Sequence, residues 1–250
     1  TDKASLPRLN DTGFRVNSEF EEDGLLLYIF SVIGTTNKRS VEIGVSDGTE
    51  CNTANFIIFH GWKGMLIDGN EKLLARGRSF YQNHPDTKSN VPVMVTSWIT
   101  RDNIDKVISD NGFNGEIDLL SIDLDGVDYY ILENIRCVKP RVIICEVAGV
   151  IPPEYAVTVP YADDFYCWNK SYPEQVFRSM SLAAANKLLK GKGYRLIGMH
   201  NLGFNAIFIL NGLGEDIFPE ITVADAYNKS INDEGRKLWK DIQGFPWVEV

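Results

Sequence analysis

A mostly apolar run at positions 41 to 45 contains Gly44. Ser46, Asp47 and Gly48 come directly after this run. Glycine lets the backbone approach a ligand closely, and ligands of open α/β sheets bind where parallel strands end. This segment is therefore the first candidate binding loop, at the join between a predicted strand and a predicted helix.

The acids of this loop distinguish between two kinds of nucleotide cofactor. Glu42 and Asp47 are negatively charged, and Ser46 and Asp47 stand where a G-x-G-x-x-G loop leaves space for a pyrophosphate. Negative charge favours the cationic methionine end of S-adenosylmethionine over a phosphate. The alternative is an ordinary strand-to-helix turn capped by Asp47. The loop by itself supports a binding loop and an ordinary turn equally.

A carboxylate, Asp68, ends the next apolar run. In this position a carboxylate accepts hydrogen bonds from both ribose hydroxyls of an adenosine. The alternative role is the N-cap of the following helix, but the preceding loop favours the ribose. Gly69 and Asn70 are predicted to line the same pocket. After the third run, Ser97 and Trp98 offer a polar edge and a flat face to adenine, with a core position as the alternative for Trp98.

Two acids, Asp123 and Asp125, crowd the end of the fourth run. They alternate, so an extended strand would point both to one face. Like charges that lie close together need a shared cation or proton, which the sulfonium, a substrate amine or a divalent metal such as Mg²⁺ would supply. A metal site at Asp123 and Asp125 is thus one prediction. The alternative places Asp123 against the cofactor and Asp125 in a turn.

A hydroxyl acceptor of a methyl group must lose its proton. The candidate bases are His200, Asp125 and Glu146, in that order, and Asn201 beside His200 is a candidate acceptor contact. The asparagine-proline-aromatic-aromatic motif of amine and nucleobase methylators does not occur in the sequence. Its absence favours methylation at oxygen.

Short apolar runs alternate with segments of helical spacing across residues 41 to 147. Runs rich in Val, Ile and Leu are typical of buried parallel strands, and the alternation predicts a parallel sheet with helices on both faces. The predicted strands are Val41–Val45, Met65–Asp68, Val91–Thr96, Ile117–Asp123 and Val142–Val147. The predicted helices are Thr49–Phe59, Glu71–Tyr81, Arg101–Ser109 and Val127–Ile135.

The C-terminal part predicts a helix at Leu182–Leu189 and then two strands, Tyr194–Met199 and Asn205–Leu210. The turn between these strands is so short that they must pair antiparallel. Five parallel strands followed by a helix and a terminal hairpin form a seven-stranded, mostly parallel sheet. This is the Rossmann-like α/β fold of class I methyltransferases.

We predict a single domain over residues 1 to 250 with three additions to the sheet. They are an N-terminal helical cap at 1–36, a substrate-side insertion at 148–180 and a C-terminal extension at 211–250. The insertion is rich in aromatic residues and proline, as walls of small-molecule pockets often are, and Tyr161 and Trp168 are its candidate acceptor contacts. An arm that packs against a second subunit is the alternative.

Composition narrows the partners and the location. A formal net charge of −9 disfavours a nucleic-acid substrate. The 4 cysteines form no C-x-x-C pair and fit a reducing compartment. There is no signal-peptide pattern and no apolar stretch of about 20 residues. We therefore expect a cytoplasmic protein with a small-molecule acceptor, no nucleic-acid or membrane partner, and room for a homodimer.

The sequence resembles class I S-adenosylmethionine-dependent methyltransferases, and within them the FkbM-like group. The matching segments cover most of residues 15 to 210. They are Glu22-Asp23-Gly24 before an apolar helix, VEIGVSDGTECNTAN, GWKGMLIDGN, IDLLSIDLDGVDYYIL, TVPYADDF and GYRLIGMHNLGFNAIFI. The resemblance implies cofactor contacts at Glu42, Gly44, Asp68 and Asp123, and it implies the cofactor far better than the acceptor.

These features lead to one hypothesis and two alternatives. The hypothesis is a methyltransferase that uses S-adenosylmethionine and acts on a small molecule, at oxygen. A nicotinamide-dependent oxidoreductase is the first alternative, and Glu42, Asp47 and the lack of a G-x-G-x-x-G motif count against it. The second alternative is a non-catalytic domain that binds the cofactor or a partner.

Overall fold

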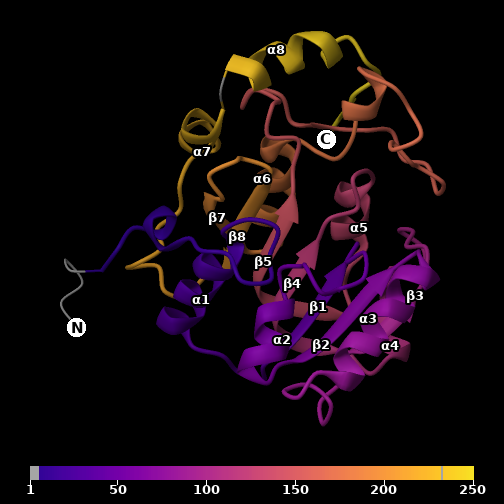
Figure 1. Ribbon diagram of the computed structural model, residues 1–250. Coiled ribbons are helices and arrows are strands. Elements are labelled where there is room, and N and C mark those ends of the chain that lie inside the picture. Colours follow the sequence, from indigo (N-terminus) through magenta and orange to yellow (C-terminus); the bar gives the residue numbers. More distant parts are fainter. Residues whose placement is uncertain (1–5, 232) are drawn as a thin grey trace. The chain divides into compact units, whose positions relative to one another are not determined.

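The computed structural model describes residues 6–231 and 233–250 (Figure 1). The chain forms two compact units. The first runs to Asp123 and takes in Ile135–Ile143, and the second comprises Leu124–Asn134 and Ile144–Val250. The organisation as one domain over residues 1 to 250 stays a prediction.

Seven strands form a sheet in the order β3-β2-β1-β4-β5-β8-β7. The strands are β1 (Arg39–Ile43), β2 (Lys63–Asp68), β3 (Val93–Thr96), β4 (Gly115–Ile122), β5 (Val138–Glu146), β7 (Tyr194–Met199) and β8 (Asn205–Leu210). Strand β1 pairs in parallel with β2 and β4, and β2 with β3, whereas β7 and β8 are antiparallel. This order is that of the Rossmann-like class I methyltransferase fold, so the predicted fold class is confirmed.

The first unit has four α-helices among its described residues. They are α1 (Glu22–Ile33), α2 (Ala54–His60), α3 (Glu71–Asn83) and α4 (Ile104–Asp110), and a short 3-10 turn, η2 (Leu9–Thr12), precedes them. The buried ring of Trp62 lies 4.6 Å from that of Phe56 on α2 and 4.9 Å from that of Phe30 on α1. These aromatic contacts pack both helices against the residues that lead into β2.

The second unit combines the hairpin with the insertion and the C-terminal extension. Its other elements are α5 (Asp128–Asn134), β6 (Val157–Thr158), η3 (Glu174–Val176), α6 (Leu182–Gly191), α7 (Val223–Ser230), α8 (Asp233–Ile242) and β9 (Val248–Glu249). Strand β6 of the insertion pairs with β9 of the extension. Ile151 and Val157 of the insertion share an apolar cluster with Trp239 and Ile242 of α8. The extension is therefore packed on the insertion.

Most predicted elements are present, with shifted ends. The hairpin strands have the predicted bounds, but the helix predicted from Thr49 begins only at Ala54. In the predicted helical cap, the described residues form α1 and η2 with irregular chain between them, and residues 1–5 lie outside the described part.

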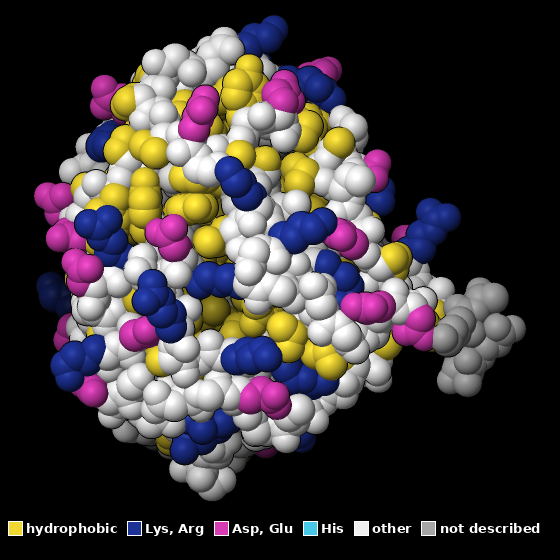
Figure 2. Space-filling view, turned by 180° about the vertical axis from the view of Figure 1, so that it is seen from behind, with side chains coloured by type: hydrophobic (Ala, Val, Ile, Leu, Met, Phe, Trp, Pro, Cys, Tyr) yellow, Lys and Arg dark blue, Asp and Glu magenta, His cyan; other side chains and the backbone are white. Residues whose placement is uncertain are grey.

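Charged side chains of both signs are mixed on the surface of the protein. On the face shown in Figure 2, Lys and Arg side chains are interspersed with Asp and Glu rather than gathered in one basic patch. All four cysteines are free. Over the residues that the structure describes, no helix is both long and apolar enough to cross a membrane.

Candidate functional site

The Glu42 carboxylate is buried beneath the loop that follows β1. Its oxygens accept hydrogen bonds from the backbone N–H groups of Asn52 and Thr53 at 2.9 and 2.8 Å, and from the hydroxyls of Thr53 and Ser121 at 2.6 and 2.9 Å. Four donors satisfy a buried carboxylate within the protein itself. Glu42 thus holds the loop and the start of α2 in place, and its contact with a cofactor stays a prediction.

Asp68 joins the ends of β1 and β2. One of its oxygens accepts the N–H of Ser46 at 2.8 Å, and the other accepts the N–H of Asn70 at 2.7 Å. The side chain of Asn70 caps α3 by accepting from Lys72 and Leu73, so the alternative role considered for Asp68 falls to Asn70. Asp68 is half-buried, and a carboxylate oxygen can accept more than one hydrogen bond. It therefore retains the capacity to bind hydroxyl groups.

The loop between these strand ends has an unusual backbone. Gly44 and Gly48 have φ of 85° and 75°, and the non-glycine residue Ser46 has φ of 56°. Asp47 folds back on its own loop, where its Oδ1 accepts the N–H and hydroxyl of Thr49 at 3.0 and 2.7 Å. Non-glycine residues in this left-handed region cluster at ligand sites. The backbone of Ser46 thus supports the prediction of a binding loop.

Helix α3 meets this loop at Gly77, where an added Cβ would lie 1.9 Å from the Asp47 carbonyl oxygen. One turn further on, the Tyr81 hydroxyl donates to the Gly48 carbonyl at 2.5 Å. We expect Gly77→Ala to force helix and loop apart and to lower the free energy of unfolding by about 1–3 kcal/mol, as overpacking does. Urea unfolding measures the change. Gly191→Ala is the control because nothing lies within 4 Å of its added Cβ, and equal losses in both variants would contradict the prediction.

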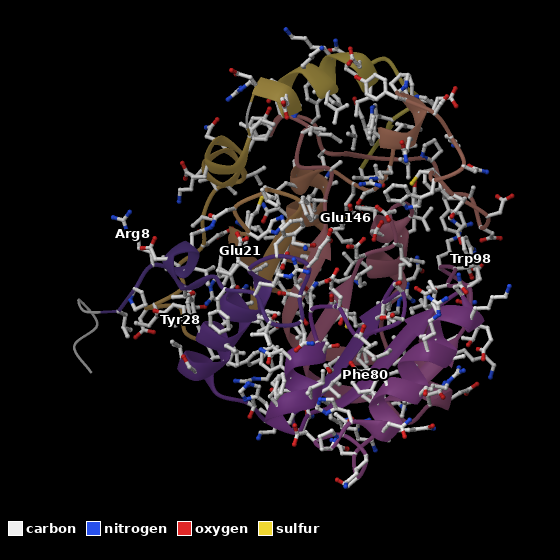
Figure 3. All side chains as sticks on the ribbon, in the orientation of Figure 1. Arg8, Glu21, Tyr28, Phe80, Trp98 and Glu146 are labelled. Carbon is white, nitrogen blue, oxygen red and sulfur yellow. The ribbon has the colours of Figure 1, made fainter. Side chains whose placement is uncertain are left out.

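An exposed indole stands beside the end of β2. Trp98 is 52% exposed, so it is not a core side chain. Trp98 is labelled in Figure 3. A Cβ on Gly69 would lie 3.0 Å from its ring, which places the indole against the backbone there. The N–H of Ser97 donates to the Asp68 carbonyl at 2.9 Å and ties the two strand ends together. A flat apolar surface therefore lies against the backbone that follows Asp68.

The end of β4 completes this edge. Asp123 is half-buried, and its N–H donates to the Ile43 carbonyl at 3.0 Å. The first unit thus brings the predicted cofactor residues to the carboxyl ends of neighbouring strands. They are Glu42, Gly44, Ser46, Asp47, Gly48, Asp68, Gly69, Asn70, Ser97, Trp98 and Asp123.

The segment before α1 also reaches this loop. The Asp23 carboxylate accepts the N–H groups of Val16, Asn17 and Ser18 at 2.7, 2.6 and 2.7 Å. The Asn17 side chain then donates to the Thr49 carbonyl at 3.2 Å. The only sequence signal was the Glu-Asp-Gly motif itself, which did not indicate that Asp23 folds the preceding residues toward the binding loop.

In the second unit, two side chains of the insertion hold Asp125, whose φ is 52°. Arg178 Nη1 lies 2.7 Å from one carboxylate oxygen, and the Trp168 indole donates to the other at 2.8 Å. Arg178 Nη2 is 3.7 Å from Glu146. Burial acts to lower the pKa of Arg178, but the Glu146 and Asp125 carboxylates outweigh it and raise that pKa above its ordinary value. Asp125, Glu146 and Trp168 are thus joined by an arginine that the sequence motifs did not single out.

The insertion packs on the residues around α5 through its aromatic side chains. The rings of Tyr161 and Tyr130 are 5.0 Å apart, and the Tyr130 hydroxyl donates to the Val159 carbonyl at 3.1 Å. Phe165 covers Gly126, where a Cβ would lie 2.6 Å from the ring. These contacts pack the insertion on its own unit, and its role as a wall of the acceptor pocket or as an arm toward a second subunit stays a prediction.

His200 lies at the hairpin turn and is only 1% exposed. Its Nε2 accepts the N–H of Phe204 at 3.0 Å, and the two rings are 4.1 Å apart. These contacts hold the turn together, and the role of His200 as a base stays a prediction. The neighbouring Asn201 is exposed.

A pocket of about 500 Å³, within the usual size of small-molecule sites, is lined by residues of the turn, the insertion and α8, including Leu202 and Tyr172.

Fold and site together define a protein of the class I methyltransferase type of fold. No protein-family model and no curated protein matches the chain. Solved structures that resemble it include the O-methyltransferase from Bacillus cereus in complex with SAH, at 15% identity over 74% of this chain and 77% of that one, with a TM-score of 0.43.

Two further structures give similar values. The methyltransferase domain of bacterial CtHen1-C is 11% identical over 76% of this chain and 97% of that one, with a TM-score of 0.49. A putative caffeoyl-CoA O-methyltransferase from Staphylococcus aureus is 14% identical over 75% and 81%, with a TM-score of 0.46. At such low identity, the function of this chain has to be argued from its own residues.

Proposed function

We propose that the chain is an S-adenosylmethionine-dependent methyltransferase of the FkbM-like group that methylates a small molecule at oxygen. Asp68 carries the proposal, because its carboxylate ends β2 and binds the backbone of the loop after β1. With the exposed indole of Trp98 beside it, this edge offers partners for ribose and for adenine. The motifs quoted from the sequence support the group, and the free thiols fit a cytoplasmic location.

Bound S-adenosylmethionine supplies an electrophilic methyl group. Asp68 would hold that cofactor at the ribose and Trp98 at the adenine face, while Asp47 and Asp123 would add negative charge suited to its cationic end. Holding the acceptor in line with the methyl group supplies the larger part of the rate, because orientation removes an entropic barrier.

With S-adenosylmethionine bound, its methyl group would be available for direct displacement by the acceptor oxygen. The hydroxyl proton passes to a base, which contributes about 10²–10⁴-fold. Among the three predicted bases we favour Asp125, because its side chain is 28% exposed and each of its oxygens can accept a further hydrogen bond beside those from Arg178 and Trp168. His200 is buried with Nε2 engaged by Phe204, and Glu146 is largely buried.

The test is a pair of titrations followed by a turnover assay. Purified protein is titrated separately with S-adenosylmethionine and NAD by calorimetry. Methyl transfer from labelled cofactor is then measured with panels of hydroxylated and amine-bearing small molecules. We expect binding of S-adenosylmethionine alone and turnover with the hydroxylated panel. Binding of NAD would favour an oxidoreductase, and cofactor binding without turnover on either panel would favour a non-catalytic domain.

A second test concerns the insertion wall. Tyr161→Ala and Trp168→Ala each remove a contact with the residues around α5, so we expect kcat/KM for the acceptor to fall roughly 10- to 100-fold through lost positioning. Cofactor affinity and mass in solution should not change. Tyr166→Ala is the control, because Tyr166 is as exposed as Trp168, at 50% and 51%, but its side chain makes no hydrogen bond, ion pair or ring contact with the described residues. A change in mass with normal kinetics would instead identify the insertion as a subunit contact.

A further inference from the structure

Two carboxylates of the second unit lie close enough to share one cation. Oxygens of Asp125 and Glu146 are within 4.8 Å of one another. Like charges at this separation repel unless a positive charge compensates them. A divalent metal is one candidate, and oxygen ligands of this kind are those that Mg²⁺ and Ca²⁺ prefer.

The Arg178 guanidinium already bridges these carboxylates. It lies 2.7 Å from Asp125 and 3.7 Å from Glu146. Its carbon Cζ is 4.8 Å from the centre of the Trp168 ring, and the Trp168 indole N–H donates to the second oxygen of Asp125 at 2.8 Å. Both oxygens of Asp125 are therefore engaged, one by a fixed positive charge and one by a neutral donor.

These contacts do not fit a divalent metal at Asp125. A metal needs carboxylate oxygens at about 2.0–2.6 Å. It would therefore have to displace the Arg178 guanidinium from Asp125. If the guanidinium stayed, its positive charge would repel the metal. The Trp168 indole and the Glu146 carboxylate both help to keep Arg178 in place, the first through a cation–π contact and the second through its charge.

We propose that Arg178 is a built-in cation that takes the place of a divalent metal at Asp125 and Glu146, and that it acts as a positioning residue for Asp125. The cluster of two carboxylates and one guanidinium is negatively charged overall, so it selects neutral or cationic acceptors against phosphorylated ones. This acceptor preference rests on the proposed function, whereas the exclusion of metal does not.

The exclusion of metal is tested with Mn²⁺ as the probe, by electron paramagnetic resonance on the full chain without cofactor or acceptor. We expect that Asp125 binds no Mn²⁺ in the wild-type protein. Any Mn²⁺ binding by wild type should therefore be unchanged in Asp125→Asn. Arg178→Gln should bind Mn²⁺ at least about tenfold more tightly, the ratio that 1.4 kcal/mol of relieved repulsion gives. The double variant with Asp125→Asn should lose that gain. Arg178→Lys keeps the charge and should behave as wild type.

Two outcomes overturn the proposal. One is Mn²⁺ binding by wild-type protein that disappears in Asp125→Asn, and the other is a folded Arg178→Gln with no gain in Mn²⁺ affinity. If Arg178→Gln does not fold, the comparison of wild type, Asp125→Asn and Arg178→Lys still decides. The acceptor preference is read separately, as turnover of a phosphorylated acceptor relative to its unphosphorylated form, which should rise in Glu146→Gln because this variant removes one negative charge of the cluster and keeps Asp125. All metal measurements stand even if the methyltransferase proposal fails.

Discussion

Asp68→Ala is expected to weaken S-adenosylmethionine binding by about 2–5 kcal/mol, which is roughly 30- to 5,000-fold in Kd. The substitution removes the carboxylate that would accept hydrogen bonds from both ribose hydroxyls. It also frees the N–H groups of Ser46 and Asn70, which now donate to that carboxylate at 2.8 and 2.7 Å. Calorimetric titration with S-adenosylmethionine measures the loss.

Two controls separate ligand binding from loop structure. Asp68→Asn keeps one oxygen acceptor and removes the charge, so its affinity should lie between those of wild type and Asp68→Ala. Asp110→Asn removes an exposed carboxylate on α4 that pairs with Lys106 at 2.6 Å, and it should leave the Kd unchanged. If Asp68→Ala binds as tightly as wild type while remaining folded, Asp68 is not the ribose ligand.

The positions of strand-end residues could be predicted because they depend on local sequence. Apolar runs with a following glycine or acid mark where each parallel strand ends, and the carboxyl ends of such strands lie at one edge. Asp68 and Ser46 were placed in this way, and the structure joins them by a hydrogen bond. The hairpin strands were also exact to the residue because so short a turn allows one pairing only.

Contacts between distant segments could not be predicted in the same way. Trp168 and Asp125 are 43 residues apart, and nothing in either segment indicates its partner. The crowded acids did indicate that a cation was needed, but not that Arg178 provides it. The partners of Glu42 could not be predicted either, although they lie closer in the sequence. The sequence of an acid at a strand end is the same whether its carboxylate contacts a ligand or accepts hydrogen bonds from the following loop.

The second large effect concerns a buried ion pair of the first unit. Asp118 on β4 is fully buried and pairs with Arg141 on β5 at 3.0 Å. The same carboxylate accepts the backbone N–H groups of Thr36, Asn37 and Lys38 at 2.8, 2.9 and 2.6 Å. Asp118 thereby anchors the chain between α1 and β1, directly before the strand that leads to the binding loop.

Asp118→Ala is expected to lower the free energy of unfolding by about 3–5 kcal/mol, because it leaves a buried guanidinium and three backbone donors without their acceptor. The midpoint of urea unfolding at constant m-value measures the change. Arg141→Met breaks the same pair from the other side. It also removes the donors to the carbonyls of Ile33 and Gly34 at the end of α1, and it should cost a similar amount.

The double variant distinguishes a coupled pair from two independent residues. With both charges gone, neither is left buried and unpaired, so the loss should be clearly smaller than the sum of the two single losses. Purely additive losses would show that Asp118 and Arg141 stabilise the unit separately, and Asp110→Asn again serves as an exposed control.

The pH dependence of stability gives an independent check on Asp118. Burial acts to raise the pKa of its carboxyl, but the three backbone N–H groups and the Arg141 guanidinium outweigh it, so that pKa lies below its usual value. A carboxyl whose pKa is lower in the folded state stabilises it above the unfolded pKa, about 3.9, and loses this contribution as the pH falls through the folded value. The difference in unfolding free energy between wild type and Asp118→Asn should therefore be constant near neutral pH and shrink below about pH 4. A difference that stays constant down to pH 2 would mean that the charge of Asp118 contributes nothing and that only its shape and hydrogen bonds matter.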